Sequence, residues 1–214
     1  MGTIREKMKD NSDMQSIEDK VLSRIRGKKK GWLFTPASFL DLGSGTTVRK
    51  ALESLCDRQV IRRLGRGLYD YPKEHPKLGL LSPTPDEIAQ ALAGKDRLKI
   101  QPSGAYAANL LGLSLQVPAR AIFLTDGATR KVKLGNQEIV LKRTTPRNMA
   151  AAGRVSGLVI QALRHLGKAH VDDAVIQKLN ARLSDDDART LMSDIKLAPA
   201  WIGDIIRHLQ KKRG

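Results

Sequence analysis

The 214-residue sequence predicts an α+β protein. Three observations support this class. Apolar residues recur at helical spacing in the first sixty residues and again from residue 154 onward, three central segments alternate like strands, and prolines at 72, 76, 83 and 85 separate two parts. The expected architecture is an N-terminal group of helices with a hairpin, followed by a mixed α/β domain that has a small sheet and a helical C-terminal part.

The N-terminal part predicts three helices in succession. Each has a start and a stop signal: Ser16 and Gly27 bound the first, Thr35 with Pro36 and Gly43 bound the second, and Ser44 or Thr46 caps the third. The expected ranges are 16–27, 34–43 and 44–59, and Val48, Leu52 and Leu55 face inward on the third helix.

The segments "VIRRL" and "GLYDY" follow the third helix and alternate like strands around "GRG", which predicts a hairpin. Three helices and a hairpin, with the short glycine-bearing turn "DLGSG" between the second and third helices, have the order of a winged helix-turn-helix. We expect a flexible segment at 1–13, a winged helix-turn-helix DNA-binding domain at 14–72, a linker at 73–84 and a C-terminal domain at 85–214.

The C-terminal domain predicts helices and strands in a mixed order. Thr84 caps a helix that begins at Pro85, and residues 102–113 predict a second helix. "RAIFLTD", "RKVKL" and "QEIVLKR" predict strands, the last two joined by a turn at Gly135–Asn136. From residue 154 onward, apolar spacing predicts four helices, centred on Leu163, Ile176, Leu191 and Ile205.

The net charge of +16 and the isoelectric point near 10.2 imply an anionic partner, with double-stranded DNA as the first candidate. Residues 1–80 carry a net charge of +7 and residues 95–154 carry +8. The single cysteine, Cys56, excludes an intrachain disulfide and fits a reducing cytosol, where it serves as a small buried or half-buried residue. No membrane span and no signal core is evident, so we expect a cytoplasmic protein.

The stretch "GSGTT" at 43–47 has some likeness to a phosphate-binding loop. A nucleotide loop of that kind needs a Lys followed by Ser or Thr directly after the last glycine, at the end of a strand. Here the preceding segment is helical and that Lys is missing. The stretch therefore predicts the start of a recognition helix instead.

A recognition helix presents its first residues to the major groove, while the hairpin or wing contacts the phosphate backbone. The helix start offers hydroxyls, N–H groups and Arg49, which can pair with a guanine edge. The wing offers arginines, and the loop "RGKKKG" is basic. The predicted DNA-binding residues are Ser44, Thr46, Thr47, Arg49, Lys50, Arg62, Arg63, Arg66, Lys28, Lys29 and Lys30.

Other candidate sites are weaker. His165 and His170 have no ligands at zinc spacing, and "SDDDAR" at 184–189 is typical of a helix N-terminus. We expect no metal, no cofactor, no catalytic residues and no enzymatic activity.

Residues 102–143 resemble the AbiEi-type antitoxins of type IV toxin–antitoxin systems, and especially their short relatives, the domain of unknown function 6088. The shared elements are "YAANLLGL" at 106–113, "QVP" at 116–118, a strand ending in Thr-Asp-Gly, and a basic hairpin. "GRGLYDYP" in the N-terminal part is also similar. The resemblance covers about residues 14–210.

This resemblance implies a bacterial antitoxin of phage defence that represses its own promoter by binding inverted repeats. Its C-terminal domain would counter a nucleotidyltransferase-like toxin, with or without direct contact. A second basic patch at Arg130, Lys131, Lys133, Lys142 and Arg143 either extends the DNA surface or meets an acidic toxin surface. Two alternatives stay open: a winged-helix transcriptional regulator with a ligand-sensing or dimerisation domain, and an RNA-binding protein.

Overall fold

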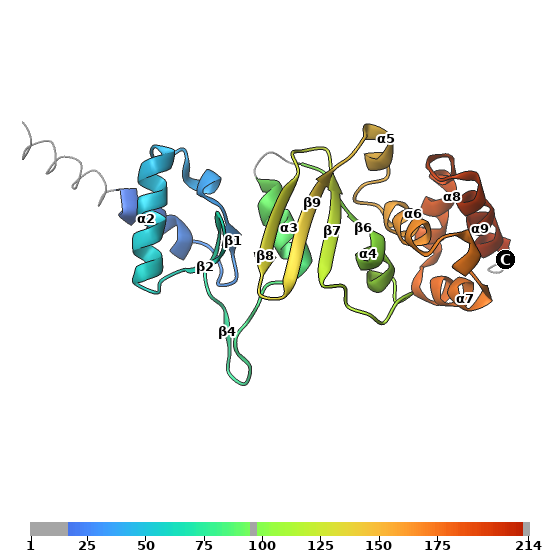
Figure 1. The fold of residues 1–214 in the computed structure, drawn as a ribbon, viewed down its shortest axis with the longest axis horizontal. Helices are drawn as coiled ribbons and strands as arrows, with labels where there is room; N and C mark the ends of the chain where they lie inside the picture. Colours follow the sequence, from blue (N-terminus) through green and yellow to red (C-terminus); the bar gives the residue numbers. More distant parts are fainter. Residues whose placement is uncertain (1–16, 95–97, 212–214) are drawn as a thin grey trace, which may run out of the picture. The chain divides into compact units, whose positions relative to one another are not determined.

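The computed structural model describes residues 17–94 and 98–211, and shows an α+β protein with a helical C-terminal part (Figure 1). Contacts divide the chain into two compact units between residues 97 and 98. The predicted flexible segment 1–13 lies outside the described residues. Each unit is described below by itself.

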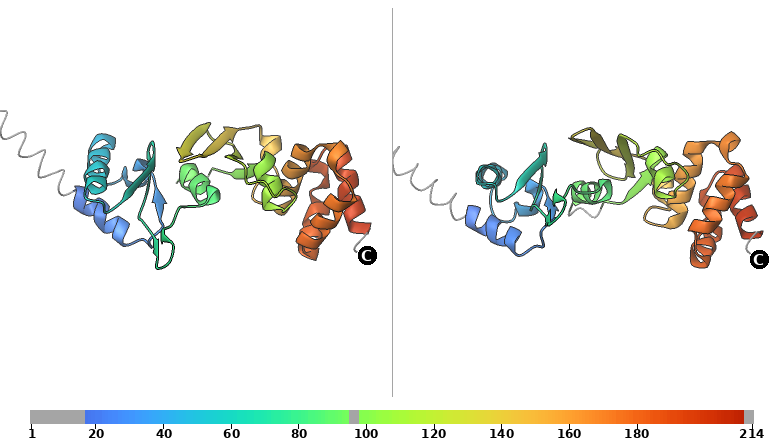
Figure 2. Two further views of the ribbon diagram at one scale, coloured as in Figure 1. Left: turned by 60° about the horizontal axis from the view of Figure 1, so that its bottom comes forward. Right: turned by 90° about the horizontal axis from the view of Figure 1, so that it is seen from below.

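The first unit contains the predicted winged helix-turn-helix. A helix over 17–26 is followed by β1 (Leu33–Phe34), the 3-10 helix η1 (Pro36–Phe39), α2 (Gly45–Asp57), β2 (Arg62–Gly65) and β3 (Leu68–Asp70). The three strands form one antiparallel sheet in the order β1-β3-β2. Figure 2 shows the β2–β3 hairpin beside α2. The expected order of three helices and a hairpin is confirmed, with β1 added between the first two.

The predicted helix at 34–43 is wrong in extent, because only Pro36–Phe39 is helical and only as a single 3-10 turn. Two interactions explain the shortening. Phe34 is held in a strand by pairing with Tyr69. The carbonyl of Ser38 accepts a hydrogen bond from Arg24 at 2.9 Å, and Asp41 pairs with the same guanidinium at 2.6 Å. These bonds tie the segment to the helix at 17–26.

An aromatic cluster forms the core of the first unit. Phe34 is 1% exposed and its ring lies 4.7 Å from Trp32, 5.4 Å from Phe39 and 6.1 Å from Tyr69, measured between ring centroids. Aromatic side chains bury large areas each, so this group compensates for the small size of the unit. Aliphatic side chains from the helix at 17–26 and from α2 complete the core, namely Val21, Leu22, Ile25, Val48, Leu52 and Leu55.

The predicted linker 73–84 contains an ordered hairpin. Strands β4 (Glu74–His75) and β5 (Gly79–Leu80) pair antiparallel, and the hairpin projects from the first unit (Figure 1). Helix α3 (Pro85–Ala93) follows, with the predicted Thr84 cap completed by Glu87. Helix α3 contacts β1 and belongs to the first compact unit, which ends at residue 97. The sequence analysis instead places this helix in the C-terminal domain, 85–214.

The second unit begins with a four-stranded sheet. Its strands are β6 (Ile100–Ser103), β7 (Arg120–Thr125), β8 (Arg130–Leu134) and β9 (Gln137–Arg143), in the order β6-β7-β9-β8. Strands β7 and β9 run parallel, and the other pairs are antiparallel. The predicted helix at 102–113 is shorter, α4 (Gly104–Leu110), because Pro102 and Ser103 complete the unpredicted strand β6.

The C-terminal part is helical, as predicted. Its elements are α5 (Pro146–Met149), α6 (Val155–Leu166), η3 (Lys168–His170), α7 (Asp173–Arg182), α8 (Asp185–Ser193), η4 (Ile195–Leu197) and α9 (Ala200–Lys211). A core of Leu, Ile, Val and Ala side chains joins α4 to these helices, with Leu163, Leu179 and Ile202 fully buried.

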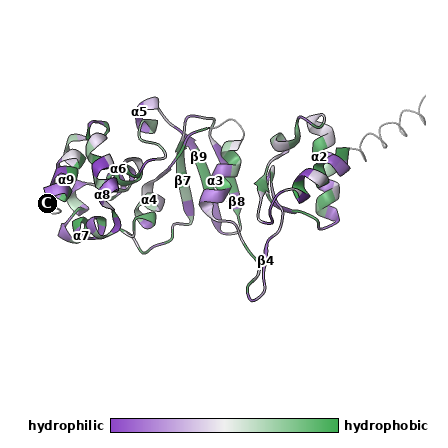
Figure 3. Cartoon of the chain, turned by 180° about the vertical axis from the view of Figure 1, so that it is seen from behind, coloured by the Kyte–Doolittle hydropathy of each residue, from purple (hydrophilic) through white to green (hydrophobic). Residues whose placement is uncertain are grey.

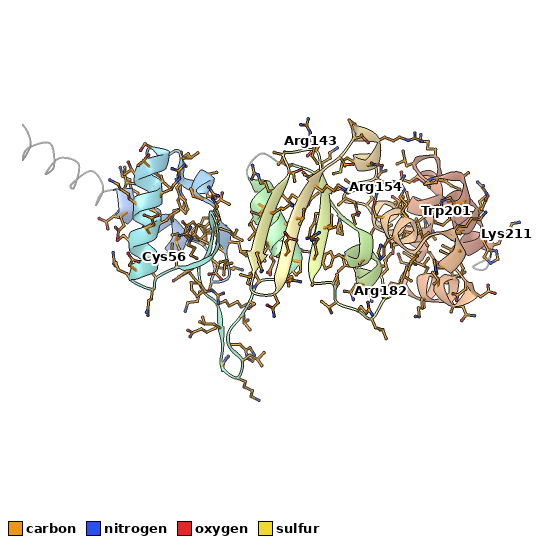
Figure 4. The ribbon with its side chains drawn as sticks, viewed as in Figure 1. Cys56, Arg143, Arg154, Arg182, Trp201 and Lys211 are labelled. Carbon is orange, nitrogen blue, oxygen red and sulfur yellow. The ribbon has the colours of Figure 1, made fainter. Side chains whose placement is uncertain are left out.

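A buried polar network fixes the start of α6. Asp194 is 5% exposed, and its carboxylate accepts a hydrogen bond from the Ser156 hydroxyl and pairs with Arg154 at 2.7 Å. Arg154 is labelled in Figure 4. Gly157 packs so closely that a Cβ there would lie 2.3 Å from the Ala151 carbonyl oxygen. The Asp194 bonds join the start of α6 to the end of α8. Gly157 lets α6 pack on β6, because a Cβ there would also lie 2.5 Å from the Gln101 side-chain oxygen.

Candidate nucleic-acid interface

The start of α2 is built by Ser44 as its N-cap. The Ser44 hydroxyl accepts a hydrogen bond from the Thr47 N–H at 3.2 Å and lies 2.8 Å from the Thr47 hydroxyl. A Ser at this position satisfies one of the N–H groups that a helix start leaves unpaired. Residues 44–47 have small side chains, which suits close approach of a phosphate or a base edge to the helix start.

The outer face of α2 carries the predicted recognition residues. Val48, Ala51, Leu52 and Leu55 are buried, so helical spacing places Arg49 and Lys50 on the solvent side. Ser44, Thr46, Arg49 and Lys50 are exposed and Thr47 is half-buried. Figure 3 shows both hydrophobic and hydrophilic residues along this helix.

The wing is the β2–β3 hairpin, which turns at Arg66 and Gly67. Gly67 has a φ of +70°, a conformation that a glycine adopts without strain. Arg63 and Arg66 are exposed. Within residues 17–94, neither of these arginines nor Arg49 forms an ion pair, so their charges remain available to an anionic partner.

Arg62 has a different role from the DNA contact that the sequence predicts. Its guanidinium binds the Asp70 carboxylate through two nitrogens, at 3.2 and 2.6 Å, and donates to the Leu81 carbonyl at 2.9 Å. The Asp70 side chain is 4% exposed. Since β-strand side chains alternate, Arg62 shares one face of the β2–β3 pair with Asp70, whereas Arg63 lies opposite Tyr69 on the other face and is exposed. Arg62 is therefore a structural residue that fixes the wing and the chain that enters α3.

The charges of arginines on α2 and on the wing both affect the Tyr69 hydroxyl of β3. Burial raises the pKa of Tyr69, and the positive charges of Arg63 and Arg49 act in the opposite direction. Arg63 also opposes the rise in the pKa of Cys56, which burial causes. Arg49 from α2 and Arg63 from β2 thus act on a single tyrosine of β3.

The lysines at 28–30 lie in a separate loop. All three are exposed, and the Lys28 ammonium sits 5.8 Å from the centroid of the Trp32 ring. The loop is attached to the chain after β3, because the Gly31 N–H donates to the Tyr71 carbonyl at 2.6 Å. The structure keeps this basic loop exposed and anchored.

The second basic patch divides between the two faces of the sheet. Lys131 pairs with Val140 and Lys133 with Glu138, so Lys131, Lys133 and Lys142 share one face. Arg130 and Arg143 have the opposite parity and lie on the other face, with Arg143 at the end of β9 (Figure 4). Arg120, which the sequence analysis missed, joins the lysine face and pairs with Glu138.

The acidic segment 184–189, His170 and Cys56 take part in local structure. Ser184 and Asp187 form a capping box at the start of α8, which confirms the helix-start interpretation of "SDDDAR". His170 bonds to the Leu166 carbonyl at 2.9 Å. Cys56 is half-buried at the end of α2 (Figure 4). Across the described residues, no group of His, Cys, Asp or Glu side chains is arranged to hold a metal ion. No described helix has the length and hydropathy needed to span a bilayer.

These features define an α+β protein with an N-terminal winged helix-turn-helix in which α2 and the β2–β3 hairpin carry exposed basic residues. The chain belongs to the family of unknown function DUF6088, whose model matches residues 20–191. The match covers the winged helix, the four-stranded sheet and most of the C-terminal helices. Searches of curated proteins and of solved structures each found no match.

The contrast between Arg62 and Arg63 yields a stability prediction. Replacing Arg62 with Ala leaves the buried Asp70 carboxylate without its cation, so the free energy of unfolding should fall by about 3 kcal/mol. Arg63→Ala is the matched control, since Arg63 is the next residue of β2, is exposed and forms no ion pair with a described residue; it should change the free energy of unfolding by less than about 0.5 kcal/mol. Urea denaturation of both variants measures the difference. Equal losses would contradict the structural role of Arg62.

Proposed function

We propose that this protein is a DNA-binding antitoxin of a type IV toxin–antitoxin system. In this proposal the winged helix binds inverted repeats in double-stranded promoter DNA and represses the protein's own promoter. The second unit counters a nucleotidyltransferase-like toxin. The protein acts by binding and needs no cofactor.

The observation that carries the DNA-binding part is the grouping of unpaired arginines on α2 and the wing. Arg49 and Lys50 stand at the exposed start of α2, and Arg63 and Arg66 are exposed on the adjacent hairpin. A recognition helix and a wing use such positions for base edges and phosphates, respectively. The net charge of +16 supports the same partner.

The antitoxin part is supported by the resemblance of residues 102–143 to AbiEi-type antitoxins. Most residues of the "YAANLLGL" motif are structural: Tyr106, Ala107, Ala108, Leu111 and Leu113 are buried. Asn109 holds the following loop by donating to the carbonyls of Ser114 and Gln116, both at 3.1 Å. The motif therefore supports a shared fold of the second unit, and the toxin-directed role is inferred from the family likeness.

The lysine face of the sheet has two possible partners. Lys131, Lys133 and Lys142 either contact DNA phosphates or meet an acidic surface of the toxin. Edge strands also carry lysines simply to prevent pairing with other chains, and β8 is an edge strand. Measuring DNA affinity and toxin rescue on one set of variants separates these roles.

A transcriptional regulator with a ligand-sensing domain is the second candidate, favoured by a hollow in the second unit. The hollow has a volume of about 520 Å³ and lies between α7 and α9. Its lining mixes apolar and charged side chains, among them Ile176, Asp173, His208 and Trp201. Trp201 is labelled in Figure 4. This role predicts a small-molecule effector that changes the affinity of the protein for its promoter. It also predicts that no toxin gene lies beside the gene for this protein.

We expect specific promoter binding with strong salt dependence. With about four to six phosphate contacts, affinity should fall roughly 10²–10³-fold between 50 and 200 mM salt, because each contact releases condensed counterions. Footprinting of the DNA upstream of the gene and a salt titration of the protected duplex test this. Salt-insensitive binding, or equal affinity for random DNA, would overturn the proposed DNA binding.

Arg49 and Arg66 should differ in what they contribute. Arg49→Ala should weaken operator binding by about 1–3 kcal/mol and relax discrimination at one base pair, as expected for an arginine that reads guanine. Arg66→Ala should weaken binding to operator and random DNA equally and reduce the salt slope by about one. Affinities for both DNAs measure the split. If Arg49→Ala loses both equally, Arg49 contacts phosphate.

Repression and antitoxicity should be separable in the full-length protein. We expect Arg49→Ala combined with Arg66→Ala to abolish repression of a promoter reporter. The same variant, expressed from an unrelated promoter, should still rescue cells that produce the toxin encoded beside the gene. Loss of rescue by this folded variant would contradict the division of labour.

The variant Lys131→Ala/Lys133→Ala/Lys142→Ala then assigns the second patch. A fall of about three in the salt slope with rescue intact assigns the lysines to DNA. Intact promoter binding with loss of rescue assigns them to the toxin. The wild-type protein serves as the reference in both assays.

A further inference from the structure

Leu40 is a large apolar residue exposed beside the start of the recognition helix. It directly follows η1 and its exposed fraction is 54%. Its neighbours Phe39 and Leu42 belong to the core of the first unit. An exposed leucine is ordinary by itself, so its exposure alone indicates nothing. Its position beside Arg49 at the start of α2 makes it a candidate contact residue.

Leu40 and Arg49 converge over Gly45, the first residue of α2. A Cβ atom on Gly45 would lie 3.7 Å from Leu40 Cδ2 and 3.8 Å from Arg49 Nη2. The end of an apolar side chain and a guanidinium group thus border the same spot at the helix start. Because Gly45 has no side chain, nothing of its own fills the space between them.

The major groove has a feature that matches this pair. Thymine carries a 5-methyl group there, which apolar side chains contact, and guanine presents the O6 and N7 acceptors that arginine binds through two nitrogens. In a 5′-TG-3′ step the thymine methyl group stands next to the edge of the guanine that follows it. An apolar group adjacent to an arginine is complementary to that step.

We propose that Leu40 and Arg49 together read a 5′-TG-3′ step in the promoter. Leu40 contacts the 5-methyl group of thymine, and Arg49 binds O6 and N7 of the guanine. This inference rests on the proposed DNA binding and names the chemistry that the site recognises. It also favours DNA over RNA, because uracil lacks the methyl group that Leu40 contacts.

Replacing single thymines by deoxyuridine in the footprinted operator tests the proposal. The change removes one methyl group and keeps the base pair and the O4 acceptor. In each half-site, one thymine immediately 5′ of a guanine should be sensitive, and its replacement should weaken wild-type binding about fourfold, the effect of burying one methyl group. Replacement of the other protected thymines should have smaller effects.

Leu40→Ala should bind the thymine duplex more weakly than wild type and should no longer distinguish thymine from uracil at that position. Leu115→Ala is the matched control, since Leu115 is 92% exposed in the loop between α4 and β7. It should keep full discrimination. At the adjacent guanine, 7-deazaguanine removes the N7 acceptor, so it should weaken wild type but not Arg49→Ala.

The possible failures are distinguishable. If wild type does not prefer the promoter, the proposed DNA binding fails and this inference fails with it. If wild type is specific but tolerates deoxyuridine at every protected thymine, only the TG inference is overturned, and this arm needs no variant protein. If Leu40→Ala still distinguishes thymine from uracil, the methyl contact belongs to another residue.

Discussion

The packing of Phe34 is the constraint on which the proposed DNA-binding surface depends. Its ring lies against Trp32, Phe39 and Tyr69, so one side chain joins β1, η1 and β3. Through η1 it fixes the turn that leads to α2, and through β3 it fixes the wing. With only eight aromatic residues in the chain, concentrating five of them at 32–71 gives a small unit a rigid core.

The positive charges of the chain have separate physical roles. Arg24, Arg62 and Arg154 each pair with a carboxylate and a backbone carbonyl, and so hold segments of the protein together. Arg49, Arg63 and Arg66 have no ion pair in the described residues and face solvent. A high net charge therefore overstates the number of residues available to a partner. Of these six arginines, only the second group belongs to the proposed interface.

The two units support the proposed function in different ways. The first unit presents exposed groups whose chemistry matches a base edge and a phosphate backbone. In the second unit, the family-like motif "YAANLLGL" is mostly buried. The ring centroids of Tyr106 and Phe123 lie 5.3 Å apart, and Ala107 and Ala108 are fully buried. Such residues maintain a fold, whereas contacts with a partner come from loops and exposed faces.

The sequence by itself determined the α+β class, the helix starts at Thr84 and Ser184, and the wing turn, because caps, glycines and apolar spacing act within a few residues. It left Ser44 and Thr46 as alternative caps of the third helix, and the structure has Ser44 as the cap. The tertiary structure decided what depends on distant partners. Strand β1 needs Tyr69, Arg62 turns inward because Asp70 and Leu81 lie beside it, and β6 forms because β7 pairs with Pro102 and its neighbours. The approach of Leu40 to Arg49 over Gly45 likewise joins residues on either side of a turn. No local pattern specifies such a contact.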